Sequence, residues 1–583
     1  MTLIRSSDTS PPQALRLGMR PIPVFFVVGE TTVDLMIPSR PEMRADELRT
    51  FDGYLLLPGG AALNTATALS FLGARVSHCG HLGRDFAGEF VVRWLSEHHI
   101  RPANTVLDPM CKTALSIISV EPGGELGIAQ HTGGNGVLSL EDIAWPALSS
   151  AIIVHVAGAF TMNSFDGAPT AQILKRAKGD GKITGLSTTR NTARKAVLFP
   201  SLPYVDYLFL NRKEATEISG CSDEETAARH LQDFGAKNVA VTLGRHGVHV
   251  RTSSDATTIG SFPVCPVDTT GCGDSFVAGF LYATSLGMDA RTAATWGNVV
   301  AAHCAKTLGA VTVPFTANEM AQTIFMHEKF GDVAALVLAG GKSQRMQNGK
   351  QKLLLDLRGK PLVTWVIDAL REAGVHRIAL LLGHDAIKVK ACLTRSPVEF
   401  VDREETPRGT GYAVKVALNY LPALPDTVLV VNGDTPLLTS ATLRRVVEHL
   451  HKSTAAVVAC VSHSPDQLAY GHGAVRRDPE GAFQKIAHAT SLDADSTAVE
   501  VNVGTYCFRK DALYEACQRL RPNGDGAIHL SDVLQTLSEA GREVALLHCP
   551  DFVEFISVNT HEHVAEVEAK LSHYKGFTTG SAK

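Results

Sequence analysis

Short apolar runs alternate with longer amphipathic stretches from residue 24 onward, and this order constrains the fold more than any other feature. The apolar runs include Ala151–Val156, Tyr207–Leu210 and Val239–Leu243, and the helix-like stretches include Ala168–Ala177, Glu214–Ile218 and Glu224–Phe234. A parallel strand reads as a continuous apolar run because it is buried on both faces, and a helix usually joins it to its parallel neighbour. The alternation therefore predicts an α/β fold with a mostly parallel sheet.

The alternation restarts in the middle of the chain, which indicates two domains. An amphipathic stretch, Ala317–Phe330, ends before Gly331, and the strand-like run Val333–Leu338 follows. A chain of 583 residues is also too long for one hydrophobic core. We expect a loose tail over residues 1–21, a first domain over 22–330 and a second domain over 331–583.

The composition excludes several classes of protein. The 55 basic and 59 acidic side chains give a formal net charge of −4, so no global positive field attracts nucleic acid or an anionic membrane. No apolar run approaches the roughly 20 residues of a membrane span. The 11 cysteines stand without the spacing of a disulfide framework or a structural zinc site. The N-terminus lacks the apolar core of a secretory signal, so we expect a cytoplasmic protein without nucleic-acid or membrane partners.

The run Gly271-Cys272-Gly273-Asp274, which opens the apolar helix-like stretch Phe276–Tyr282, is the most informative motif of the first half. Glycines at the start of a helix bring several backbone N–H groups to one point, where the helix dipole adds positive potential. Such a site holds an anion or the charge on a transferring phosphoryl group. Asp274 beside it could accept the proton of an incoming hydroxyl. The alternative is an ordinary glycine turn capped by Asp274.

Three further segments give the motif a context: Pro58–Ala66, Asn211–Glu214 and Gly244–Gly247. With them, the first half resembles the ribokinase (PfkB) family of sugar and nucleoside kinases over about residues 24–328. The resemblance implies an αβα sandwich with a small β-sheet lid from residues around 33–57 and 110–132. It implies Asp274 as the base, an anion hole of Gly271, Cys272 and Gly273, and the substrate hydroxyls held by Asp34, Gly59, Gly60 and Asn64. It also implies Mg²⁺ and the ATP phosphates at Asn211 and Glu214, and a nucleotide side of Thr242, Gly244, Gly247 and Asn298.

Cys272 departs from the family, which more often has Ala at this position. The residue would contribute its backbone N–H, so the change is tolerable. A helix N-terminus can lower the pKa of a thiol, and the alternative that we favour is a plain packing role.

A second glycine turn follows the strand-like run that ends at Leu338. Ala339, Gly340 and Gly341 could wrap phosphates with backbone N–H groups, and Arg345 and Lys352 could supply charge to the pyrophosphate side. The pattern is neither a P-loop nor G-x-G-x-x-G. Asp434 stands after the buried run 427–431, at the strand end where an open α/β sheet binds ligands, and a carboxylate there suits Mg²⁺.

The segments Pro407–Ala413, Glu500–Tyr506, His529–Val533 and Ser557–Thr560 complete a second resemblance. Residues 333–570 resemble the sugar-1-phosphate nucleotidyltransferases, and most of all the uridylyltransferase domain that acts on N-acetylglucosamine 1-phosphate. The resemblance implies a Rossmann-like domain in which Ala339, Gly340 and Gly341 hold the nucleotide, Lys352 the phosphates, Gly409 and Thr410 the base, Asp434 and Asn559 Mg²⁺, and Gly473 and Asn502 the sugar.

The sugar pocket departs from this family. His472 and Ala474 replace the family's tyrosine and arginine, and the sugar-binding glutamate falls on His488. One interpretation is a misaligned loop with a surface histidine, and the sharper one is a sugar other than N-acetylglucosamine.

These observations predict a bifunctional enzyme that phosphorylates a sugar with ATP and transfers a nucleotidyl group from an NTP to a sugar 1-phosphate. We expect the enzyme to use Mg²⁺, ATP and a second NTP, for which UTP is the favoured candidate. A monovalent cation is a further candidate cofactor. The partners expected are small-molecule sugars and nucleotides, and a homo-oligomer stays open. We favour phosphorylation at the anomeric hydroxyl because the second reaction consumes a sugar 1-phosphate. The alternatives are a kinase of a primary hydroxyl or a nucleoside with an uncoupled second domain, and one domain that only senses a ligand.

Overall fold

The computed structural model describes residues 21–574 apart from several internal positions. Those positions are 38–52, 104, 121–125, 263, 265, 341–350, 384–385, 394–397, 403–407, 422–423, 465–472, 488–498 and 524–525. The chain divides into two compact units, Met1–Ile324 and Phe325–Lys583. The expected amphipathic stretch Ala317–Phe330 is helix α9, and it spans the division between the units.

A nine-stranded sheet forms the centre of the first unit, in the order β15-β14-β13-β12-β11-β10-β1-β4-β6. Strands β6 to β13 of this order pair in parallel, and β14 and β15 are antiparallel at one edge. The strands are β1 Val24–Gly29, β4 Arg75–Cys79, β6 Arg101–Pro102, β10 Ile153–Ala159, β11 Ile183–Thr188, β12 Tyr207–Asn211, β13 Asn238–Thr242, β14 Val248–Arg251 and β15 Ala256–Ile259. The mostly parallel sheet confirms the predicted fold class.

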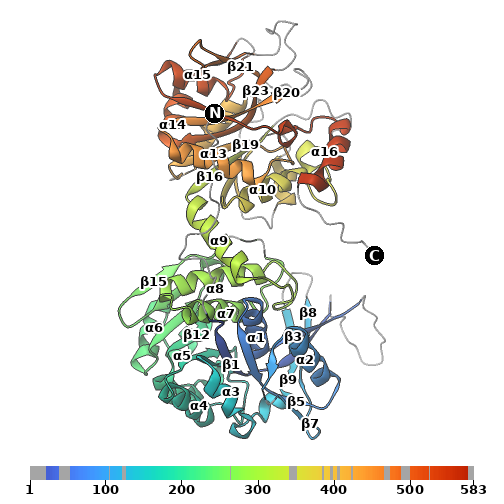
Figure 1. Cartoon of the computed structure of the whole chain (residues 1–583), viewed down its shortest axis with the longest axis vertical. Helices are drawn as coiled ribbons and strands as arrows, with labels where there is room; N and C mark the ends of the chain where they lie inside the picture. Colours follow the sequence, from blue (N-terminus) through green and yellow to red (C-terminus); the bar gives the residue numbers. More distant parts are fainter. Residues whose placement is uncertain are drawn as a thin grey trace. The chain divides into compact units, whose positions relative to one another are not determined.

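Helices cover both faces of this sheet, because the side chains of each strand alternate between two apolar cores. Phe25 and Val27 of β1 belong to one core, and Phe26 and Val28 belong to the other. The first core packs against α1 Ala61–Phe71, α2 Phe86–Glu97, α7 Cys272–Ser285 and α8 Ala290–Cys304. The second packs against α3 Trp145–Ser150, α4 Ala168–Gly179, α5 Arg212–Ser219 and α6 Glu224–Asp233, and Figure 1 shows α7 and α4 on opposite sides of the strands.

Two smaller sheets stand beside the large one in this unit. The first has the order β3-β2-β8-β9, built from β2 Thr32–Ile37, β3 Leu55–Gly59, β8 Ala114–Val120 and β9 Leu126–His131. It comes from the residues that the sequence assigned to a small β-sheet. The second pairs β5 His81–Gly83 with β7 Val106–Asp108 in parallel.

The second unit is also a mixed sheet between helices, in the order β18-β17-β16-β19-β23-β20-β24 with β21 and β22 at its side. Its strands are β16 Val333–Ala339, β17 Arg377–Leu382, β18 Glu399–Asp402, β19 Thr427–Asn432, β20 Val457–Ser464, β21 Gly473–Arg477, β22 Phe483–Ala487, β23 Val499–Arg509 and β24 Val544–His548. Its helices are α10 Leu362–Glu372, α11 Ala386–Cys392, α12 Thr410–Tyr420, α13 Ser440–Lys452, α14 Lys510–Arg519, α15 Asp532–Glu539 and α16 His561–Tyr574. Strands β18, β17, β16 and β19 are parallel, so their carboxyl ends share one edge. Among the described residues, no helix is long and apolar enough to cross a membrane.

Candidate active sites in the two units

One cavity of about 500 Å³ in the first unit collects most of the predicted kinase residues. Its lining includes Asp34, Gly60, Asn64, Asn211, Glu214, Thr242, Gly271, Gly273 and Asp274. These residues come from the small sheet, from the start of α1, from the carboxyl ends of β12 and β13, and from the start of α7. Segments that are far apart in the sequence thus converge on one hollow at the end of the parallel strands.

Asp274 lies in the first turn of α7, where backbone geometry fixes its place. Gly271 caps the helix with φ of 72°, and an added Cβ would lie 2.3 Å from the Ala310 Cβ, so only glycine fits. Asp268 holds the preceding loop by accepting hydrogen bonds from the Thr270 N–H at 2.9 Å and the Gly309 N–H at 2.9 Å. The glycine motif is therefore a rigid entry to the helix.

The environment of Asp274 suits a general base. The Asn64 Nδ2 donates to its Oδ2 at 2.8 Å, which lowers the pKa, but desolvation has the larger effect and raises it. Coulombic repulsion from Glu30 also raises the pKa, and the result is a pKa of about 7. A carboxyl with that pKa can accept a proton near neutral pH.

Asp34, on the small sheet, also has a raised pKa. Burial, and then repulsion from Glu30, raise its pKa to about 7 against the lowering effect of a hydrogen bond with Ser116. An ideal Cβ on Gly59 would lie 2.3 Å from the Asp34 Oδ2, so Gly59 makes room for this carboxylate although it does not line the cavity.

Asn211 and Glu214 form a capping box where β12 passes into α5. The Asn211 Oδ1 accepts from the Glu214 N–H at 2.9 Å, and the Glu214 carboxylate accepts from the Asn211 N–H at 3.1 Å. Thr188 Oγ1 donates to Glu214 at 2.8 Å. Burial raises the pKa of Glu214, which leaves a partly desolvated carboxylate on the cavity wall.

The other predicted kinase residues are not among those that line the cavity. Gly244 and Gly247 flank the turn between β13 and β14, and Gly247, with φ of 91°, passes so close to the Ile259 carbonyl that a Cβ would lie 1.9 Å from it. Asn298 on α8 uses its Nδ2 to donate to the Gly260 carbonyl at 2.9 Å. Gly247 and Asn298 therefore both contact the chain at the end of β15.

The thiol of Cys272 is not activated. Its N–H donates to the Thr269 carbonyl at 3.3 Å. A hydrogen bond with the Cys304 thiol, and then burial, raise the pKa of the Cys272 thiol. The direction is opposite to that of an activated thiol, which favours the packing role.

Two charged residues of the lining, Glu30 and Arg190, were not predicted from the sequence. Glu30 follows β1, is 8% exposed, and accepts from the Ala61 N–H and from Gln130 Nε2, both at 3.3 Å. Arg190 follows β11 and is the lone basic side chain among the described lining residues. Both stand just after the carboxyl end of a parallel strand, and that position is the signal that could have found them.

The second unit brings Lys352, Asp434 and Asn559 together. The Lys352 Nζ donates to the Asp434 Oδ2 and, at 3.0 Å, to the Asn559 Oδ1. Ser557 Oγ donates to the same Asp434 oxygen at 2.8 Å, and Asn559 Nδ2 donates to Ser557 Oγ at 3.0 Å. Ser557 lies in the run Ser557–Thr560, but no role for it was predicted from the sequence.

The strand ends explain this arrangement. Gly433, between β19 and Asp434, donates its N–H to the Leu338 carbonyl at 3.0 Å, so Ala339 and Gly340 lie at the neighbouring strand end. The predicted residues Gly341, Arg345 and His488, with His472, lie outside the described residues.

The predicted base and sugar residues also occupy constrained positions. Gly409 precedes α12 with φ of 90°, and a Cβ there would lie 2.3 Å from the Ile528 carbonyl; Thr410 Oγ1 accepts from the Leu530 N–H at 3.0 Å. Gly473 of β21 pairs with Asn502 of β23, whose Nδ2 donates to the Tyr506 hydroxyl at 2.6 Å. Gly473 and Asn502 are therefore adjacent, as a shared subsite requires.

Comparison with known proteins agrees with both units. Residues 25–316 match the pfkB family carbohydrate kinases, and residues 335–540 match the MobA-like NTP transferase domain. The chain is 34% identical over 239 residues to the bifunctional protein GlmU of Shouchella clausii, and 36% identical over 239 residues to that of Exiguobacterium sibiricum. Each alignment covers 41% of this chain and 52% of the relative, so the chain spans about half the length of these relatives.

Solved structures resemble one half of the chain. A ribokinase from Thermotoga maritima has 24% identity and a TM-score of 0.45, and Arabidopsis thaliana ribokinase complexed with ribose and ATP has 20% and 0.47. Each match covers 52% of this chain and 99% of the other. The chain belongs to the pfkB family of carbohydrate kinases, and its kinase domain is followed by an NTP transferase domain of the MobA-like type.

Proposed function

We propose that the first unit transfers the γ-phosphoryl group of ATP to a sugar hydroxyl, with Asp274 as the general base. The observation that carries this proposal is the position of Asp274 on the cavity wall, at the start of α7, with a pKa of about 7. Near neutral pH a large share of this carboxyl is ionised and can take the hydroxyl proton as the new P–O bond forms. The start of the helix, which follows Gly271, supports the negative charge of the phosphoryl group.

The sugar side of the cavity is proposed to consist of Asp34, Asn64 and the glycine turn before α1. Asp34 and Asn64 offer carboxylate and amide groups that hydrogen-bond to hydroxyls. Gly59 and Gly60 let the chain pass close to its neighbours on this wall, because a Cβ on Gly60 would lie 2.6 Å from the Glu30 carbonyl. Gln130 of the small sheet lines the same cavity and donates to Glu30, so this sheet contributes polar groups to the substrate wall.

The phosphate side of the cavity has a donor set that fits Mg²⁺. Four carboxylates line the cavity against one arginine, and Glu214 presents a carboxylate beside the Asn211 amide. Oxygen donors of this kind suit Mg²⁺, which neutralises charge on ATP when it is bound. Arg190 lines the same cavity close enough to Glu214 to lower the pKa of that carboxyl, and its guanidinium would orient the phosphates.

We propose that the second unit transfers a nucleotidyl group from an NTP, UTP first, to a sugar 1-phosphate with release of pyrophosphate. Asp434 and Asn559 each give one oxygen to the Lys352 ammonium, so both oxygens already face one cationic position. That pair of oxygens fits Mg²⁺, which would polarise the α-phosphate when bound. Lys352, released towards the phosphates, would stabilise charge on the leaving pyrophosphate.

We further propose that the two reactions are consecutive. The second reaction needs a sugar 1-phosphate, and a kinase that acts on the anomeric hydroxyl produces one. Asp274 serves whichever hydroxyl lies nearest to it, and Asp34 and Asn64 decide which one that is.

Two separate incubations test this function. The full chain is given ATP with a panel of sugars, and in parallel UTP or another NTP with a panel of sugar 1-phosphates. We expect ADP in the first and pyrophosphate in the second, each with at least one sugar. A chain that forms neither product with any member of the panels would contradict the proposed function.

A further inference from the structure

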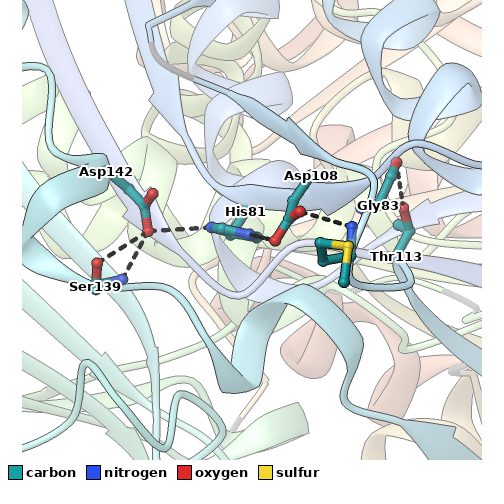
Figure 2. A network of polar contacts seen from close by, with 7 residues as sticks. His81, Gly83, Asp108, Thr113, Ser139 and Asp142 are labelled. Atoms are coloured by element: carbon teal, nitrogen blue, oxygen red, sulfur yellow. Dashed lines mark hydrogen bonds and ion pairs between the residues drawn. The ribbon is translucent and has the colours of Figure 1, made fainter.

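A polar network outside the kinase cavity surrounds His81, the first residue of β5. The His81 Nδ1 lies 3.2 Å from the Asp142 Oδ2, and its Nε2 lies 3.3 Å from the Asp108 Oδ2. Figure 2 shows the imidazole between the two carboxylates, with Ser139 beyond Asp142. The ligand atoms of His81, Asp108 and Cys111 lie within 4.8 Å of one another.

The backbone that carries these side chains is held in place. The Arg84 N–H donates to the Asp108 carbonyl at 3.0 Å, and the Gly134 N–H donates to the Lys112 carbonyl at 2.8 Å. A Cβ on Gly83 would lie 2.6 Å from the Cys111 carbonyl, and one on Gly134 would lie 1.9 Å from the His81 carbonyl. The segments approach one another so closely that glycine is required on both sides, and the cluster is therefore preorganised.

We propose that His81, Asp108 and Cys111 bind a zinc-type divalent transition-metal ion beside the two-stranded sheet of β5 and β7. Imidazole, carboxylate and thiolate form a mixed N, O and S set, which prefers Zn²⁺ to Mg²⁺ or Ca²⁺. Three protein ligands leave a fourth tetrahedral position for water. Binding releases the proton of the Cys111 thiol, and any proton on His81 Nε2, to solvent.

The separation of His81 and Asp108 fits two ligands of a tetrahedral ion. Nitrogen and oxygen ligands at about 2.0–2.1 Å from Zn²⁺ stand about 3.4 Å apart at the tetrahedral angle. His81 Nε2 and Asp108 Oδ2 are 3.3 Å apart, so this edge of the tetrahedron is already present. Cys111 completes the set from the turn that follows β7, with its sulfur within 4.8 Å of the other two ligand atoms.

Asp142 supplies the outer partner that metal-binding histidines require. A carboxylate on Nδ1 fixes the ring and the tautomer, so that Nε2 is free to face the metal. Asp142 is itself held by the Ser139 N–H at 2.8 Å and by its hydroxyl at 3.4 Å. Asp108 is likewise oriented, because its other oxygen accepts from the Met110 N–H at 2.7 Å.

The charges around the cluster also favour a cation. The carboxylates of Asp108, Asp85 and Asp142 lie near the Cys111 thiol, so the local potential is negative. Asp108 is 28% exposed, which gives an ion a path from solvent. An ion here would join β5 and β7 to the turn that enters β8, the strand that carries Ser116 to the kinase cavity.

Absorption spectroscopy with Co²⁺ tests the proposal directly. The full chain, treated with a chelator, is titrated with Co²⁺ and then with Zn²⁺. We expect one equivalent of Co²⁺ to produce a thiolate-to-cobalt band with tetrahedral d–d bands, and Zn²⁺ to bleach both. Cys111→Ser should remove the thiolate band, whereas the matched control Cys392→Ser, at an exposed cysteine of the other unit, should keep it. Asp142→Asn should keep the band and weaken the affinity about 10–100-fold.

A second measurement uses the unaltered chain, so it does not depend on how a variant folds. Alkylation of Cys111 by iodoacetamide is followed by peptide mass spectrometry with and without Zn²⁺. Saturating Zn²⁺ should slow this alkylation at least about tenfold, because the metal holds the thiolate, and should leave Cys392 unaffected. No thiolate band, a band that survives Cys111→Ser, or equal alkylation rates would overturn the proposal.

Discussion

The central aspartates of the two units, Asp274 and Asp434, have opposite electrostatic surroundings. Asp274 is desolvated and is repelled by Glu30, and these effects outweigh the hydrogen bond from the Asn64 amide, so its pKa rises to about 7. Asp434 receives the Lys352 ammonium and the Ser557 hydroxyl on one oxygen. A buried carboxylate without a counter-charge can accept a proton near neutral pH, whereas a carboxylate that faces a cation offers its oxygen to a metal ion. This contrast underlies our proposals of proton transfer in the first unit and charge neutralisation in the second.

Asp274→Asn should cause the largest loss. The amide keeps the shape and the contact with Asn64 but cannot accept a proton, so kinase turnover should fall about 10²–10⁴-fold. Nucleotidyl transfer by the same preparation should stay at the wild-type rate, and a coupled ADP assay beside a pyrophosphate assay separates the two. Loss of both activities in a folded variant would contradict two independent sites.

Asp434→Asn should have the reverse effect, with a smaller magnitude. Removal of one charge from the proposed metal site should lower nucleotidyl transfer on the order of 100-fold, and higher Mg²⁺ should recover part of the rate. The kinase rate serves as the internal control. Pyrophosphate release at the wild-type rate and the wild-type Mg²⁺ dependence would remove Asp434 from the site.

Asp34→Asn should stabilise the first unit in a pH-dependent way. The folded-state pKa of about 7 lies above the ordinary value of 3.8, so ionisation of Asp34 penalises the folded state increasingly as pH rises between these values. The free energy of unfolding should therefore rise by at most about 4 kcal/mol at pH 8, since one pKa unit is about 1.4 kcal/mol. Urea unfolding at pH 5 and pH 8 measures the gain, and an equal gain at both would contradict the raised pKa.

Asn64→Ala should give the smallest and most specific change. The Asn64 hydrogen bond lowers the pKa of Asp274, so its loss should raise that pKa and move the acid limb of kinase kcat/KM to higher pH. A weaker sugar affinity alone would lower the profile without moving the limb. The pH profile of nucleotidyl transfer should not change, and a kinase limb that moves to lower pH would refute the assignment of Asn64.

The sequence predicted what local pattern controls. Three predicted features depend only on residues that are close together in the sequence, and the structure contains all of them. They are the new strand after Ala317–Phe330, the glycine turn that opens α7, and the strand end before Asp434. The sequence did not predict Glu30 and Ser557, because a single acid or serine carries no spacing signal of its own. His81 and Cys111 were missed for a related reason: 29 residues separate them, and only the pairing of β5 with β7 brings them together.

One coupled reaction tests the consecutive use of the two units most directly. The full chain receives a sugar that its kinase accepts, together with ATP, UTP and Mg²⁺, and ³¹P–¹H correlation NMR follows the phosphates. We predict a transient phosphate on the anomeric carbon, followed by pyrophosphate and a nucleotide sugar, and no nucleotide sugar from Asp274→Asn unless sugar 1-phosphate is added. A phosphate that accumulates on the terminal carbon, without pyrophosphate release, would contradict the coupling of the two reactions.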